Sequence, residues 1–100
     1  MIIYNVTVQV EDEIKEDWLK WMQEKHIPAV MATGRFREHR IFEMLTHKQA
    51  GHQAYAIQYV AKSMEDYEEY QRDYAPTLQQ EHRDRYGDSA IGFRTLMKQL

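Results

Sequence analysis

The chain opens with an alternation of apolar and polar residues that is typical of a β-strand with one buried face. Between residues 2 and 10, one set of alternating residues is apolar throughout: Ile2, Tyr4, Val6, Val8 and Val10. The other set is mostly polar: Ile3, Asn5, Thr7 and Gln9. A second alternation, over residues 52 to 61, sets Tyr55, Ile57 and Tyr59 against Ala54, Ala56, Gln58 and Val60. Both segments are therefore predicted to be strands.

Two further strands are predicted from less regular patterns. Residues 35 to 47 carry apolar groups on both faces, which indicates burial on both sides or a β-bulge. Residues 90 to 99 form the last strand. In that strand Ile91, Phe93 and Met97 share one parity, so we expect them to face the core. The parity of Gly92, Arg94 and Leu96 is then expected to face away from it.

The first helix is predicted after the acidic run at residues 11 to 13, because negative charge is favoured at a helix N-terminus. Its apolar stripe comprises Ile14, Trp18, Trp21 and Met22. Pro28 is expected to end this helix, because its ring disfavours the α conformation of the preceding residue. A short helix from Ala29 to Thr33, capped by Gly34, should follow.

The second helical region begins with a capping box, in which the Ser63 hydroxyl and the Asp66 carboxylate lie three residues apart. The apolar stripe continues through Tyr67, Tyr70, Tyr74 and Leu78. Pro76 should kink or split this helix near residues 73 to 75. Gly87 is expected to end it.

This order of elements, β-α-β-β-α-β, predicts one α+β domain over residues 1–100 with the ferredoxin-like arrangement. Both helices should cover one face of a four-stranded antiparallel sheet, whose strands lie in the order fourth, first, third, second. The other face would expose Ile3, Val60, Leu96 and part of 41 to 45. A contiguous apolar patch usually marks an interface. We therefore expect a homodimer, joined through the sheet faces into a dimeric α+β barrel that encloses a cavity.

Composition excludes several classes of protein. The net charge of −3 gives no excess of base for a nucleic acid partner. Cysteine is absent, which excludes disulfides and thiolate chemistry. No apolar run approaches the length of a membrane span, and the first residues lack the features of a signal peptide. We expect a cytoplasmic protein without a membrane partner.

Several motifs spread over the chain resemble an uncharacterised bacterial family, domain of unknown function 4286. They are residues 3–8, Trp18-Leu19-Lys20-Trp21-Met22, His26-Ile27-Pro28, Ala32-Thr33-Gly34, Gln58-Tyr59, Tyr74-Ala75-Pro76, Gly87-Asp88 and Phe93-Arg94-Thr95. The resemblance covers the whole chain. It implies a dimeric α+β barrel, the architecture of small monooxygenases of antibiotic biosynthesis and of haem-degrading enzymes, and it implies no established function.

The candidate site is a polar group on the sheet: Asn5, Thr7, Gln58 and Arg94. Strand pairing is expected to bring them to one patch on the uncovered face. Two interpretations stay open. The side chains satisfy one another across a dimer interface, since an unpaired buried polar group costs about 1–3 kcal/mol. Alternatively, they form a small-molecule pocket in which Arg94 binds an anion such as a carboxylate.

His26 is a weaker candidate. It is expected at the C-terminal end of the first helix, where the helix dipole favours an imidazolium. A capping or packing role beside Pro28 is the simpler interpretation, and a general base is the alternative. The histidine spacings predict no metal site, and nothing predicts a cofactor or a catalytic residue.

The sequence thus predicts a homodimeric protein that binds a small ligand or serves as an interaction module. The alternative is a monooxygenase-like enzyme that uses the same cavity, without a cofactor or with haem. RNA-recognition motifs share this fold and stack bases on strand aromatics. Tyr4, however, belongs to the parity that must face the helices, so it is not available for stacking.

Overall fold

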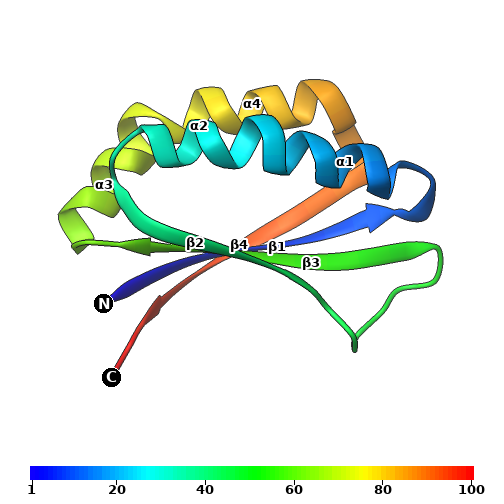
Figure 1. The fold of residues 1–100 in the computed structure, drawn as a ribbon, viewed down its shortest axis with the longest axis horizontal. Helices are drawn as coiled ribbons and strands as arrows, with labels where there is room; N and C mark the ends of the chain where they lie inside the picture. Colours follow the sequence, from blue (N-terminus) through cyan, green and yellow to red (C-terminus); the bar gives the residue numbers. More distant parts are fainter.

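The computed structural model describes residues 1–100 and shows a single helical layer on one face of a four-stranded antiparallel sheet (Figure 1). The strands are β1 (Ile2–Glu11), β2 (Phe36–Glu43), β3 (His52–Ala61) and β4 (Ala90–Lys98). Their spatial order is β2-β3-β1-β4, so the predicted ferredoxin-like topology is confirmed. For β2 the sequence leaves burial on both sides or a bulge open. The strand is mostly exposed, and its register shift lies between Phe36 and Glu38, ahead of the apolar pairs that suggested a bulge.

The first helical region runs without a break from α1 (Lys15–Trp21) through η2 (Met22–His26) to α2 (Ile27–Ala32), after a 3₁₀ turn, η1 (Asp12–Ile14). The prediction that Pro28 ends the helix is wrong. Segment η2 is a π-helix, in which the Ile27 N–H donates to the Met22 carbonyl five residues back. This wider turn accommodates a proline that would clash in regular α geometry. The helix ends at Gly34, which adopts a φ of 75°.

The second helical region is split as predicted, into α3 (Met64–Asp73) and α4 (Ala75–Tyr86). Tyr74 separates them, with φ −124° and ψ −40°. The Ser63 hydroxyl accepts a hydrogen bond of 3.1 Å from the Asp66 N–H, which confirms the N-cap. A 3₁₀ turn, η3 (Gly87–Ser89), then leads into β4. No helix has the length and apolar character needed to cross a membrane.

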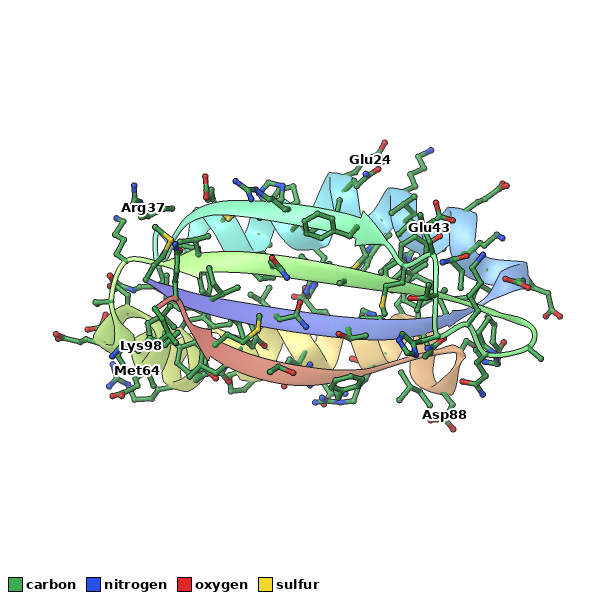
Figure 2. All side chains as sticks on the ribbon, turned by 90° about the horizontal axis from the view of Figure 1, so that it is seen from below. Glu24, Arg37, Glu43, Met64, Asp88 and Lys98 are labelled. Carbon is green, nitrogen blue, oxygen red and sulfur yellow. The ribbon has the colours of Figure 1, made fainter.

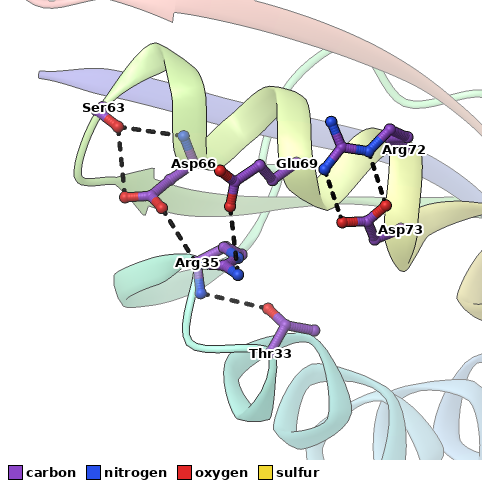
Figure 3. Close-up of polar contacts among 7 residues, drawn as sticks. All are labelled: Thr33, Arg35, Ser63, Asp66, Glu69, Arg72 and Asp73. Carbon is purple, nitrogen blue, oxygen red and sulfur yellow. Dashed lines mark hydrogen bonds and ion pairs between the residues drawn. The ribbon is translucent and has the colours of Figure 1, made fainter.

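One arginine ties the two helical regions together at the end of the molecule where α2 leads into β2 (Figure 3). The Arg35 guanidinium lies 3.4 Å from the Asp66 carboxylate and 3.2 Å from that of Glu69, both in α3. Thr33 holds the same turn, because its hydroxyl accepts from the Arg35 N–H and donates to the Val30 carbonyl. These ion pairs of Arg35 are partly exposed to solvent, so each one adds little to the free energy of unfolding.

The core lies between the helices and the sheet. It includes the predicted apolar parity of β1 and the matching parity of β3, and the helices contribute Trp18, Met22, Ile27, Val30 and Tyr70. Tyr4 is 3% exposed and stacks against Phe36 and Tyr59. It therefore faces the helices, as predicted, and is unavailable to an RNA base.

The sequence-based prediction for β4 is wrong in parity. Register pairs Val6 of β1 with Arg94, and Val8 with Gly92. Directly paired residues point to the same face of a sheet, so Gly92, Arg94 and Leu96 share the helix-covered face. Conversely, Ile91, Phe93 and Met97 lie on the uncovered face, where Ile91 and Phe93 are 59% and 63% exposed. The prediction assumes that the more apolar set of alternating residues in β4 faces the core. In the structure, the register with β1 decides which set faces the helices.

Candidate functional site

The residues predicted as one site fall into two groups on opposite faces of the sheet. Asn5, Thr7 and Gln58 lie on the uncovered face, which is turned toward the viewer in Figure 2. Asn5 stands opposite Gln58 in the register of β1 with β3, and its amide donates a 3.0 Å hydrogen bond to the Thr7 hydroxyl. Arg94 and His26 lie on the other side of the sheet, so the expected convergence of Arg94 with the amides does not occur.

A cavity of about 310 Å³ lies between the helices and the sheet, and it contains both His26 and Arg94. Strands β1, β3 and β4 form its floor, and η2, α2, α3, α4 and η3 contribute to its walls. Apolar and aromatic side chains make up much of the lining, namely Tyr4, Val6, Val8, Met22, Val30, Ile57, Tyr59 and Tyr70. Its size and lining are those of a small-molecule pocket within one subunit.

Arg94 brings a positive charge to this cavity. Its Nε donates a 3.1 Å hydrogen bond to the Tyr4 hydroxyl, which orients the guanidinium over the floor. No carboxylate lies within ion-pair distance of it. Asp88 is the one acidic residue that lines the cavity; it is exposed, at the edge of the sheet where α4 turns into β4 (Figure 2). The terminal nitrogens of Arg94 therefore remain available to an anion.

Two histidines lie on the wall opposite the sheet. The His26 ring packs at a tilt against Trp21, and the His26 and His82 ring centroids are 6.1 Å apart. Burial, and then the charges of His82 and Arg94, lower the pKa of His26 to about 4. Burial also lowers the pKa of His82, with Arg94 and Arg83 acting in the same direction. Both imidazoles are therefore neutral near neutral pH. The predicted imidazolium at a helix end is wrong, because the helix continues past His26 to Ala32.

His82 was not identified from the sequence, where it appears within a run of charged residues that indicates a solvated helix face. In the structure its Nε2 accepts a 2.9 Å hydrogen bond from the indole N–H of Trp18. An indole nitrogen can only donate, so His82 Nε2 carries no proton. The proton of the neutral ring consequently resides on Nδ1. Only its spacing of four residues from Leu78, which itself follows Tyr74 by four, indicates that His82 lies on the buried face of the helix.

The tyrosines add neutral hydroxyl groups to the cavity. Burial raises the pKa of Tyr59 and of Tyr70 well above the ordinary tyrosine value, with neighbouring tyrosines as a lesser cause. Both therefore stay protonated. The Tyr4 hydroxyl accepts from Arg94, which leaves its own hydrogen free to donate. The cavity thus combines an unpaired cation with several neutral donors.

Comparison with solved structures shows the fold. An ethyl tert-butyl ether d (EthD) family protein from Bacillus halodurans matches with a TM-score of 0.73 and 11% identity, over 100% of both chains. A dimeric ferredoxin-like protein from an uncultured marine organism matches with a TM-score of 0.68 and 12% identity, over 96% of this chain and 92% of the other. A "putative monooxygenase" from Shewanella loihica matches with a TM-score of 0.60 and 13% identity, over 99% of this chain and 94% of the other.

Sequence comparison adds the family. No functionally curated protein matches this sequence. The family model described as "Domain of unknown function (DUF4286)" matches residues 1–100. The match extends over the whole chain, and the chain belongs to the DUF4286 family.

Proposed function

We propose that this protein binds a small organic anion in the cavity between its helices and its sheet. The observation that carries the proposal is Arg94, whose guanidinium lines an aromatic cavity without a carboxylate partner. Arg94 is an exposed residue, but its Nε is fixed by the hydroxyl of the buried Tyr4, so its charge is held beside the cavity. A guanidinium in such a position binds carboxylates and phosphates through paired hydrogen bonds. A ligand with an apolar body and one anionic group satisfies both the lining and the charge.

A thermal-shift screen of small carboxylates and phosphates tests this function. Saturation to ten times Kd stabilises the folded protein by about 1.4 kcal/mol, which raises the melting temperature by several degrees. The shift should disappear in Arg94→Gln. The matched control is Arg40→Gln, because Arg40 is a strand arginine opposite Gln58, on the uncovered face. Equal shifts in both variants, or none in the wild type, would refute the proposal.

We further propose that two copies pack through their uncovered sheet faces. Ile91 and Phe93 are more than half exposed there, and Asn5, Thr7 and Gln58 lie beside them. A neighbour of the same fold is described as dimeric. Burying the apolar part of this face would stabilise the dimer by about 25 cal/mol for each Å² of apolar surface removed from water. The amide and hydroxyl groups would then serve the interface, while the ligand cavity lies within each subunit.

A monooxygenase-like enzyme is the second candidate, favoured by the neutral His26 beside the cavity. A neutral imidazole is a proton acceptor, but a pKa of about 4 makes His26 a weaker base than an ordinary histidine, so this candidate stands second. The structural neighbour from Shewanella loihica that is described as a "putative monooxygenase" shares only the fold, at 13% identity. Oxygen uptake by the protein with an oxidisable ligand that the screen identifies would support an enzyme. Binding without uptake would leave a binding protein.

A further inference from the structure

The hydrogen-bond capacity of the cavity is strongly biased toward donors. Arg94 offers its terminal N–H groups, and the Tyr4 hydroxyl has a hydrogen left after accepting from Arg94 Nε. The cavity-lining His82 offers an N–H at Nδ1, because Nε2 is occupied by the Trp18 indole. This N–H has no hydrogen-bond partner within the protein. It is accessible to solvent, whereas Nδ1 of His26 is buried.

The three donors come from different elements and carry different charges. Arg94 is a cation on β4, Tyr4 is a neutral hydroxyl on β1, and His82 is a neutral imidazole on α4. All three residues line the same cavity. Neutral and cationic donors gathered around one site are the arrangement that stabilises an oxyanion. A neutral imidazole held in one tautomer acts as a donor in such sites.

Resting on the proposed function, we propose that the anion is a phenolate-type oxyanion, which the site binds after the phenol has lost its proton. Arg94 neutralises the charge, and Tyr4 and His82 donate to the oxygen. The proton of the phenol passes to solvent, so charge and atoms balance without a further reactant. The aromatic rings of Tyr4 and Tyr59 on the floor, and of Tyr70 from α3, match a planar ring.

Trp18 sets the role of His82 in this site. Protonation of His82 at Nε2 would require loss of the bond from the buried Trp18 indole, so the ring is held as an Nδ1 donor. His82 therefore acts as a hydrogen-bond donor to the oxyanion, and Trp18 is a positioning residue that touches no ligand.

The probe is 4-nitrophenol, which absorbs visible light only as the phenolate. At a pH where the free phenol is mostly neutral, the wild-type protein should generate the phenolate absorbance. We expect the pKa of the bound phenol to fall by about one unit, which is a tenfold preference for the anion. Arg94→Gln should abolish the shift. Binding of 4-nitrophenol with an unchanged pKa would overturn the inference.

Two isosteric variants separate the donor from its structural bond. In His82→Gln the amide oxygen takes the place of Nε2, so the Trp18 bond is kept while the Nδ1 donor is lost. In His82→Asn the amide nitrogen takes the place of Nδ1, so the donor is kept while the Trp18 acceptor is lost. The phenol pKa shift should shrink in His82→Gln and persist in His82→Asn, whereas a merely structural His82 would give the reverse.

Further results distinguish this inference from the proposed function. If His82→Gln does not fold, Tyr4→Phe removes another donor of the same set and should also reduce the shift. Carboxylates that bind through Arg94, together with an unshifted phenol, would leave the proposed function standing and refute the phenolate site. Failure of every small anion to bind would refute both.

Discussion

The Trp18 indole donates a 2.9 Å hydrogen bond to His82 Nε2, joining two residues 64 positions apart. Trp18 belongs to α1 and His82 to α4, so the bond connects the two helical regions above the cavity. Around it, the His82 ring packs edge-on against Trp18 and at a tilt against Trp21, and Trp21 also packs edge-on against Tyr86. One polar bond within an aromatic cluster therefore fixes both the helix packing and the tautomer of a cavity residue.

Trp18→Ala should destabilise the protein by about 3–5 kcal/mol, because it empties the space of a fully buried aromatic side chain. Urea denaturation would measure the loss. Trp21→Ala should cost less, since Trp21 is only half-buried. Equal losses in the two variants would contradict the packing of α1. Trp18→Phe keeps most of the volume and removes the bond to His82, so its cost reports mainly on that bond.

Stability should fall in mild acid because of His26. Its pKa is 6.5 in the unfolded chain and about 4 in the folded protein. Between these values the unfolded state binds a proton that the folded state does not. The free energy of unfolding therefore decreases as the pH falls from about 6.5 to about 4, by up to roughly 3 kcal/mol. His82 acts in the same direction.

Urea denaturation at a series of pH values between neutral and pH 4 measures this dependence. His26→Gln removes the titrating group and should flatten the curve over that interval. A variant at the exposed His39, such as His39→Gln, serves as the control and should keep the wild-type slope. Identical slopes in all three proteins would show that His26 does not titrate as described.

Gly92→Ala should destabilise the sheet and narrow the cavity. A Cβ at this position would lie 2.8 Å from the Thr7 carbonyl oxygen and 3.2 Å from a Val8 methyl group. The first contact is with backbone, which cannot move aside cheaply, so a cost of about 1–3 kcal/mol is expected. Gly34→Ala is a useful comparison, because it meets no neighbour within 4 Å and is strained only by its φ of 75°. A stability of Gly92→Ala equal to the wild type would contradict the β1–β4 register.

A charge at Phe93 should weaken the proposed dimer. Phe93 is 63% exposed on the uncovered face, so Phe93→Glu changes the interface without emptying the core. Light scattering of the wild type should give twice the mass of the chain at micromolar concentration, and that of Phe93→Glu a lower mass. Glu68→Lys alters an exposed charge on α3 and should leave the mass unchanged. A monomeric wild type would rule out the dimer.

Leu96 shows why the variant must be chosen from the structure. The sequence places Leu96 on the dimer face, and a charge there would be the natural test. The register pairs it with Tyr4, which is buried beneath the helices. Leu96 itself is 39% exposed, but it stands on the helix-covered face, so a charge there would not test an interface on the uncovered face.

Much of the fold follows from the sequence alone. The alternation in β1 and β3 identifies the buried parity of both strands, because one parity is apolar throughout β1 and from Tyr55 to Ala61 in β3. The Ser63 cap, the break at Tyr74 and the turn glycines depend on local backbone chemistry, so their positions are determined by neighbouring residues. The topology then follows from the order of the elements.

Tertiary structure decided the site. In β4 each parity contains apolar residues, so local pattern cannot choose a face, and pairing with β1 turned Arg94 inward and Phe93 outward. The π-helix lets the helix continue past Pro28 and places His26 in the wall of the cavity. Helix packing brings His82 into hydrogen-bond contact with Trp18, 64 residues away in the chain. The sequence by itself determined which elements form and in what order, because those depend on near neighbours. Only the three-dimensional pairing decided which side chains meet, because register and helix packing are set by contacts between residues far apart in the chain.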